Sequence, residues 1–563
     1  NSEVDVVQSV GRVMRKAEGK KFGYIIIPVV IPANADASEI LDKSDDFKIV
    51  WSVLNALRAH DDRFNATINK IELNKKKPSI IKVVGGKVSA ESAINGENAQ
   101  NVTPIDDLQQ KLFEEFEKLQ AVVYAKMVEK CGDRRYWEDW GKDVGEIAKR
   151  NIERIKALIK EDGEHKKKFR EYLDGLRKNI NPAVTETDAI EMLAQHIVTK
   201  PVFEALFGSN QFTSQNPVSK SLDGIVQLLD EKTDKDDIEK LSRFYESVKK
   251  RVENIDNAEG KQKIVVKLYD SFFRNAFPLT VEKLGIVYTP VEVVDFIIHS
   301  VEWVLNTQFN RSLTDKNVNV IDPFTGTGTF ITRLLQSGII KDEDIERKYK
   351  SEIFANEIVL LAYYIASVNI ENVYNTNREK YEAFKGICLT DTFQLYEYEK
   401  TLDDSVFAEN SERVNEQRAK PITVIMGNPP YSVGQKSAND NAQNQSYPKL
   451  ERRIASTYAA LSEATNKNSL YDSYIKAFRW ATERLNSVEN GIVAFVSNGS
   501  WLDGNAQDGF RKTIEKEFSK IYVFNLRGNC RTSGELRKKE AGNIFGLGSR
   551  TPISITILVK SKE

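Results

Sequence analysis

The chain has 563 residues, of which 40% are hydrophobic and 29% charged, and its formal net charge is −1. This length predicts about three or four domains, and the composition is that of a globular rather than a disordered protein. No apolar run approaches the ~20 residues that span a bilayer, and the three cysteines and four histidines lie far apart. Membrane, secreted and metal-dependent proteins are therefore excluded, no metal site is predicted, and a cytoplasmic protein is expected.

Residues 1–33 combine a short helical stretch, Val6 to Lys16, with the strand-like run from Tyr24 to Pro32. The β-branched residues of this run and the prolines that bound it predict a buried strand. A helix and a strand of this length cannot form their own core, so they are expected to complete a larger domain.

Residues 34–260 show apolar positions at helical spacing, which predicts a mainly α-helical domain without a fixed repeat. The polar stretch from Leu73 to Val102 is expected to be a loop or an extended insertion. The helices are predicted at Phe47–Leu57, Leu108–Val128, Tyr136–Ile159, His165–Ile180, Thr187–Val198, Leu222–Leu229 and Ile238–Val252.

From residue 261 onwards, short β-branched runs alternate with helices, which predicts an α/β domain with a mostly parallel sheet and helices on both faces. Ligands of such sheets lie beyond the carboxyl ends of the strands. The strands are predicted at Val318–Ile321, Ile353–Ala355, Ile422–Met426, Ile492–Val496, Ile521–Phe524 and Ile553–Val559.

Three strand ends of this domain carry candidate binding residues. Asp322 to Phe330 forms a glycine-rich turn in which Gly326 and Gly328 permit close approach of a ligand; an ordinary strand-to-helix turn is the alternative. Glu357 ends the next strand, where a carboxylate can accept both hydroxyls of a ribose. Asp391 follows a third strand and is either an acceptor for an exocyclic amine or a helix cap.

The fourth strand end carries Asn428, Pro429, Pro430 and Tyr431. Two consecutive prolines fix the backbone, so the Asn428 side-chain oxygen and the Pro429 carbonyl can both accept hydrogen bonds from one planar amine. Such an amine is conjugated and poorly nucleophilic, and drawing its hydrogens out of plane frees its lone pair. Tyr431 offers a face on which a base can stack. An amine inside a duplex is unreachable, so the target base must be flipped out.

These motifs, in this order, resemble those of S-adenosylmethionine-dependent amino-methyltransferases. The segment from Leu284 to Pro290 resembles the additional cofactor motif of gamma-type adenine-N6 DNA methyltransferases, which have a Rossmann-like fold. The stretches from Gly427 to Lys449 and from Asn525 to Gly534 resemble type ISP (single-polypeptide type I) restriction–modification enzymes, and the resemblance covers most of the chain.

The resemblance implies S-adenosylmethionine as cofactor and flipped adenine in double-stranded DNA as substrate. In such enzymes the glycine loop and the Thr289 position hold the methionine moiety, the Glu357 position the ribose and the Asp391 position the adenine of the cofactor. The implied catalytic residues are Asn428, Pro429, Pro430 and Tyr431, and the implied cofactor-binding residues are Tyr288, Thr289, Pro290, Asp322, Phe324, Thr325, Gly326, Gly328, Phe330, Glu357 and Asp391.

The N-terminal segment resembles the last signature of superfamily 2 helicases, in which Gln8, Arg12 and Arg15 contact ATP in the intact parent only. The implied domains are the end of a second RecA-like domain (1–33), a helical coupler (34–260) and the methyltransferase (261–563). No Walker A, DEAD-like or nuclease motif occurs in the sequence. The chain is therefore expected to be a fragment whose missing helicase, nuclease and target-recognition domains belong to the parent polypeptide, an ATP-dependent restriction endonuclease as well as a methyltransferase.

Three alternatives remain open. A similar Asn-Pro-Pro-Tyr motif occurs in enzymes that methylate a glutamine amide in proteins, and a non-catalytic DNA-binding or motor-coupling module would retain the fold without the reaction. Cytosine N4 is a conjugated amine like adenine N6. For DNA contact the sequence favours Arg511 to Glu540, where nine basic residues face four acidic ones.

Overall fold

The structure is a computed structural model, and it describes residues 25–27, 29, 41, 45–60, 64, 67–68, 81, 123, 127, 136–160, 163–207, 212–229, 246, 289–376, 378, 380–399, 402, 405–430, 446–530, 532–540, 542–545 and 551–562. The chain divides into two compact units, residues 1–140 with 242–264 and residues 141–241 with 265–563. The second unit joins predicted coupler helices to the sheet domain. The predicted domain limits do not coincide with this division and stay predictions. Within the described residues, no helix is both long and apolar enough to cross a membrane.

The first unit contains helix α3 (Asp45–His60), close to the helix predicted from the apolar spacing. Its buried face packs with residues distant in sequence, and Trp51 Nε1 donates to the carbonyl oxygen of Leu41 at 3.2 Å. The predicted buried strand from Tyr24 to Pro32 is wrong for the part that is described. No strand is assigned at residues 25–27 or 29, and Ile26 is 87% exposed while Ile25 and Ile27 pack beside Val53. The segment presents alternate side chains to the helix without a neighbouring strand among the described residues. Val6 to Lys16 lies outside the described residues.

The coupler helices are α6 (Tyr136–Lys160), which begins in the first unit and continues in the second, and α7 (Glu164–Asn179), α8 (Glu186–Phe207), α9 (Phe212–Gln215) and α10 (Pro217–Leu229) of the second unit. Four of them match helices predicted from sequence, and α8 continues through Pro201 beyond the predicted end. The helices predicted at Leu108–Val128 and Ile238–Val252 fall almost entirely outside the described residues.

The sheet domain contains seven strands in the order β3-β2-β1-β4-β5-β7-β6. The strands are β1 (Val320–Asp322), β2 (Ile353–Glu357), β3 (Ile387–Leu389), β4 (Val424–Gly427), β5 (Gly491–Asn498), β6 (Lys520–Arg527) and β7 (Ile553–Lys560). Strands β1 to β5 run parallel and β7 is antiparallel to both of its neighbours, which confirms the mostly parallel sheet. The central pair of strands is β1 and β4. Strands β2 and β3 lie on the β1 side of this pair, and β5 lies on the β4 side. Such a reversal of strand order is where open α/β sheets bind ligands.

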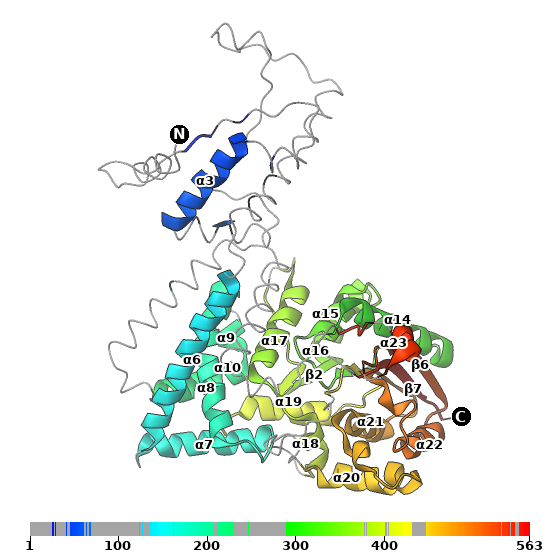
Figure 1. Cartoon of the computed structure of the whole chain (residues 1–563). Coiled ribbons are helices and arrows are strands. Elements are labelled where there is room, and N and C mark those ends of the chain that lie inside the picture. The colour runs from blue at the N-terminus through cyan, green and yellow to red at the C-terminus, as the bar shows by residue number, and fades with distance from the viewer. Residues whose placement is uncertain are drawn as a thin grey trace. The chain divides into compact units, whose positions relative to one another are not determined.

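Helices cover both faces of the sheet, as expected. The helices are α14 (Val291–Phe309), α15 (Thr329–Gln336), α16 (Asp342–Ser351), α17 (Leu360–Asn375), α18 (Thr392–Glu397), α19 (Ala408–Ala419), α20 (Pro448–Ile454), α21 (Ser473–Arg484), α22 (Asp508–Glu517) and α23 (Gly534–Glu540). Helix α17 packs on β2 and β3 and also on coupler helix α8, and Figure 1 shows the coupler helices beside it. Burial on both sides explains why α17 is apolar nearly all round.

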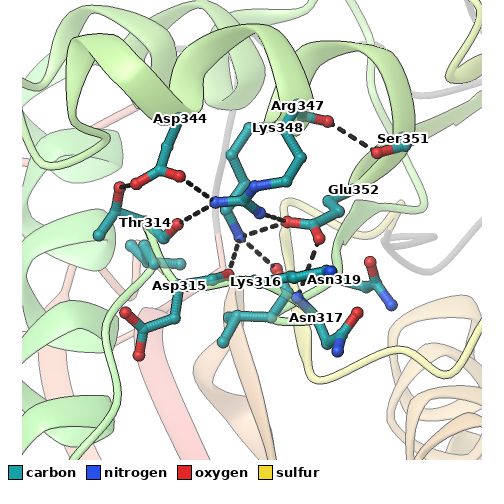
Figure 2. A network of polar contacts seen from close by, with 12 residues as sticks. Thr314, Asp315, Lys316, Asn317, Asn319, Asp344, Arg347, Lys348, Ser351 and Glu352 are labelled. Atoms are coloured by element: carbon teal, nitrogen blue, oxygen red, sulfur yellow. Dashed lines mark hydrogen bonds and ion pairs between the residues drawn. The ribbon is translucent and has the colours of Figure 1, made fainter.

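A buried polar network fixes the amino ends of β1 and β2, at the end of the sheet away from the predicted site (Figure 2). Lys348 is fully buried and donates to the carbonyl oxygens of Asp315 at 2.7 Å and Val318 at 2.8 Å. Its third partner is the Glu352 carboxylate at 3.0 Å, which also pairs with Arg347. Burial lowers the pKa of Lys348, and the contact with Glu352 opposes this shift. All three ammonium donors are used within the fold, so this lysine has a structural role.

Candidate active site at the carboxyl ends of the central strands

The glycine-rich turn after β1 folds back onto the end of β2. Thr325 N donates to the carbonyl oxygen of Asn356 at 3.0 Å, and Gly326 N donates to Glu357 Oε2 at 2.7 Å. Gly326 has φ +56° and Gly328 has φ +85°, a region that glycine enters without strain. A Cβ on Gly328 would lie 3.1 Å from Ala366 Cα in α17, whereas a Cβ on Gly326 would meet no atom within 4 Å. Gly328 is thus required by helix packing, and Gly326 leaves open space above the turn.

Glu357 lies at the end of β2, where the prediction placed a ribose-binding carboxylate. Its Oε1 accepts hydrogen bonds from Ile358 N at 3.0 Å and Val359 N at 2.8 Å, while Oε2 accepts only the bond from Gly326 N among the described residues. Burial raises the pKa of Glu357 to about 7, and the three backbone hydrogen bonds oppose that rise. An acceptor position therefore remains at Oε2 next to the open side of the turn. This geometry is compatible with the ribose role, which stays a prediction.

Asp322, the last residue of β1, is completely buried next to the end of β4. Its Oδ1 accepts from Phe324 N at 3.1 Å, and its Oδ2 has no hydrogen-bond partner among the described residues. A Cβ on Gly427 would lie 2.6 Å from Asp322 Oδ1, so only glycine fits there before the diproline corner. Burial raises the pKa of Asp322 to about 8, and the nearby Glu357 carboxylate adds to this rise.

The diproline corner lies directly beside this carboxylate. Asn428 Nδ2 donates to Thr289 Oγ1 at 3.0 Å, a contact between residues 139 positions apart. Asn428 Oδ1 is buried and has no hydrogen-bond partner among the described residues. A buried acceptor left unpaired costs about 1–3 kcal/mol, and at a strand end of this sheet a ligand can supply the missing donor. The oxygen that sequence analysis assigned to the amine is therefore left available, while the amide nitrogen is tied to the upstream motif.

Asp391 is the N-cap of α18, the alternative that its position also allowed. Its Oδ1 accepts from Phe393 N at 2.9 Å and Gln394 N at 3.3 Å. Its Oδ2 accepts from coupler residue Asn181 and from Tyr447, both at 2.8 Å. Burial raises the pKa of Asp391, and the hydrogen bonds from Asn181 and Tyr447 lower it. The capping role is present in the fold, and the cofactor role stays a prediction.

The other predicted site residues are divided between the site and its surroundings. Thr289 is buried against Asn428, and Pro290 is the N-cap of α14. Phe324 lies partly buried with its ring centroid 5.4 Å from that of Phe393. Phe330 is buried in α15 and thus contributes to the core. Five predicted residues lie outside the described part of the chain: Gln8, Arg12, Arg15, Tyr288 and Tyr431.

Three residues near the site were not predicted. Gly427 has a sequence signal, because it directly precedes the diproline motif at the end of a strand. Asn356, fully buried, donates to Thr392 Oγ1 at 3.2 Å. Asn181 had no signal, because an isolated asparagine after a predicted helix says nothing about its distant partner.

The basic stretch from Arg511 to Glu540 stays a predicted DNA contact, and the structure shows how two of its basic residues are held. Arg511 is used inside the fold, where it donates to the carbonyl oxygens of Trp501 and Gly504. Lys512 pairs with Glu463 and Asp508. The stretch continues through edge strand β6, which β5 and β7 separate from the catalytic corner.

The pKa of Asp322 predicts the pH dependence of stability. The folded-state pKa of about 8 lies above the value of about 4 in an unfolded chain, so the folded state holds an extra proton between these pH values. This contribution to the free energy of unfolding therefore falls as pH rises from about 4 to about 8, by something on the order of 5 kcal/mol. Asp322→Asn cannot titrate, so its stability should decline less than the parent's from pH 5 to pH 8 in urea unfolding. Equal slopes would contradict a protonated Asp322 in the free protein.

The chain matches two family models. Residues 136–260 match the coupler domain of type ISP restriction–modification enzymes, and residues 260–518 match the N-6 DNA methylase family. A methylase of this family implies a methyl donor of the S-adenosylmethionine type. No curated protein matches the chain.

Among solved structures the chain is similar to the ATP-dependent type ISP restriction–modification enzyme LlaBIII bound to DNA, with 46% identity and a TM-score of 0.86 over 100% of this chain and 37% of that chain. It is also similar to a nuclease-deletion mutant of the type ISP enzyme LlaGI in complex with a DNA substrate mimic, with 44% identity and a TM-score of 0.83 over 100% of this chain and 42% of that chain. A DrdV–DNA complex shows 37% identity and a TM-score of 0.69 over 76% of this chain and 42% of that chain. The chain thus spans less than half of the length of each of these relatives, and it belongs to the family of type ISP restriction–modification enzymes.

Proposed function

We propose that this chain carries an adenine-N6 DNA methyltransferase, which transfers a methyl group from S-adenosylmethionine to the exocyclic amine of a flipped adenine. The observation that carries the proposal is the buried Asn428 Oδ1 at the corner beside Asp322, which has no hydrogen-bond partner among the described residues. The methylase family match supports the same reaction. The alternative of a non-catalytic module gives no reason to retain a costly unpaired acceptor at this position.

The residues present fit S-adenosylmethionine. Within the part of the chain that the structure describes, Gly326 leaves open space above the turn, Glu357 Oε2 has a remaining acceptor position, and Asp322 Oδ2 is a buried acceptor without a partner. When bound, the cofactor supplies a methyl group on a positively charged sulfonium, for which a neighbouring carboxylate is a favourable partner. A cation beside Asp322 favours the ionised form of this residue, against the burial that raises its pKa. The predicted roles of Tyr288, Thr289, Pro290, Thr325, Phe324, Phe330 and Asp391 belong to this proposal.

Asn428 and Pro429 would prepare the target amine. The Asn428 oxygen and the Pro429 carbonyl accept its two hydrogens, which draws them out of the plane of the base and frees the nitrogen lone pair for attack. Transfer would form an N–C bond to the amine as the S–C bond of the cofactor breaks, and the proton that the amine loses would pass to solvent water. Catalysis of this kind rests on positioned acceptors and on alignment of the two reactants. Pro430 fixes the backbone of the corner, and Tyr431 supplies the stacking surface.

A methyl-transfer assay on mixed-sequence DNA with nucleoside analysis tests the proposal. We expect N6-methyladenine as the product. N4-methylcytosine would replace the base assignment, and methylation of a glutamine-containing protein but not of DNA would favour the protein amide alternative. The proposal also includes a longer parent polypeptide, which would carry an ATP-dependent motor, a nuclease and a target-recognition domain. The DNA-bound states of LlaBIII and LlaGI support double-stranded DNA as the partner.

A further inference from the structure

The last turn of coupler helix α7 is anchored at the carboxyl end of β3. Thr390 Oγ1 donates to the carbonyl oxygen of Asn179 at 2.9 Å, and Ser411 Oγ donates to the Asn179 side-chain oxygen at 2.8 Å. The Tyr398 hydroxyl donates to the carbonyl oxygen of Lys178 at 2.7 Å. Three parts of the sheet domain thus hold the end of α7, and with it the start of the loop that carries Asn181, in place next to Asp391.

Asn181 is the coupler residue that reaches the predicted cofactor carboxylate. It is 4% exposed, and its Oδ1 accepts from Ala183 N at 2.8 Å. This turn within the loop fixes which way the amide faces, so that Nδ2 donates to Asp391 Oδ2 at 2.8 Å. The partners are 210 residues apart in sequence. The contact joins two regions that match different family models, the coupler and the methylase.

The two oxygens of Asp391 are held differently. Oδ2 is clamped by two side chains from outside α18, Asn181 and Tyr447, each at 2.8 Å. Oδ1 accepts the two capping bonds, of which the bond from Gln394 N is long at 3.3 Å. The clamp on Oδ2 therefore determines where Oδ1 points, and the weak bond at Oδ1 is the one that an incoming amine can most easily replace.

We propose that Asn181 is a positioning residue for the cofactor, through which the coupler holds Asp391 in the orientation that accepts the exocyclic amine of the cofactor's adenine. This inference rests on the proposed function. Coupler packing and cofactor occupancy are then linked, and by reciprocity the bound cofactor strengthens the attachment of the coupler loop to the sheet domain.

The test measures S-adenosylmethionine affinity by calorimetry on the full chain from pH 5.5 to pH 8.5. Asn181→Ala should weaken binding by about 5-fold or more, within the usual range of coupling between sites. Asp322 and Glu357, with pKa values raised to about 8 and about 7, also titrate in this range, but the substitution leaves their contacts unchanged. Loss of the donor raises the pKa of Asp391 further above its ordinary value, so the pH profile of affinity should shift to higher pH relative to the parent. A merely structural role would not move this pH profile.

Asn216→Ala is the matched control. Asn216 is also a buried coupler asparagine, which donates Nδ2 to the Tyr363 hydroxyl at 3.1 Å and accepts backbone N–H groups of its own helix start. Asn216→Ala removes one hydrogen bond between the coupler and the sheet domain, at a place away from Asp391. This variant should retain the parent's cofactor affinity and pH profile.

Two further variants guard against a folding defect. Asn181→Ser retains an acceptor for Ala183 N, but its side chain is too short to reach Asp391. Tyr447→Phe removes the second donor to Asp391 Oδ2 and keeps the aromatic ring. Both variants should weaken cofactor binding. Parent-like affinity and pH profile in folded Asn181→Ala or Asn181→Ser, or tighter binding, would overturn the inference alone. A parent chain that binds no S-adenosylmethionine would overturn the proposed function and the inference with it.

Discussion

Asn428→Ala is expected to reduce methyl transfer by about 10²–10³-fold, the usual cost of removing one positioned hydrogen-bonding group from a reacting centre. The substitution removes Oδ1, the buried acceptor that has no partner among the described residues. It also removes the donation from Nδ2 to Thr289 Oγ1, which frees a hydroxyl but leaves the backbone of the corner fixed by two prolines. The loss should therefore appear in the rate of transfer, measured in single-turnover assays with radiolabelled cofactor.

Cofactor affinity distinguishes a catalytic role of Asn428 from a general disturbance of the site. We expect Asn428→Ala to bind S-adenosylmethionine within about twofold of the parent, because uniform binding is unaffected when only a transition-state contact is lost. Asn486→Ala, at an exposed asparagine whose Nδ2 contacts Glu483, provides a control for asparagine substitution outside the site and should keep the parent's rate. An unchanged turnover in Asn428→Ala would exclude the catalytic assignment.

Gly326→Ala is expected to weaken S-adenosylmethionine binding by about 10-fold or more, because an extra methyl group occupies space that the ligand needs. In the free protein that methyl group meets no atom within 4 Å, so the cost to folding comes from φ +56° alone. A left-handed conformation costs a non-glycine residue about 1–2 kcal/mol. Calorimetry measures the affinity, and thermal unfolding confirms that the variant is folded.

Gly338→Ala separates the loss of cofactor affinity from the loss of stability that a left-handed backbone causes. Gly338 has φ +73° and also has no atom within 4 Å of an added Cβ, but it lies after α15 and outside the predicted site. It should lose similar stability and keep the parent's cofactor affinity. Equal affinities in the two alanine variants would show that Gly326 serves only the turn. Gly328→Val is a poorer test, because its Cβ would press on the Ala366 backbone and disturb the packing of α17 even in the absence of cofactor.

Local chemistry explains why much of the fold could be predicted. The β-branched runs became β1, β2, β4, β5, β6 and β7, and the helical spacing predicted α6, α7 and α10 to within a few residues. Helix α17 was not predicted, because it packs on the sheet and on α8 and so has no polar face to create a helical period. Residues 25–27 show the opposite case, in which a strand was predicted and none is assigned. Strand-forming residues need a neighbouring strand to pair with, and the described residues provide none.

The sequence by itself determined which residues stand at the strand ends, because alternating strands and helices place the residues after each parallel strand at one edge of the sheet. It also determined the rigid corner at Pro429 and Pro430 and the need for glycine in the turn. Only the tertiary structure decided which of these side chains meet. Thr289 and Asn428 are 139 residues apart, and Asn181 and Asp391 are 210 apart. Their hydrogen bonds depend on the packing of whole helices against the sheet, and no local propensity records that packing.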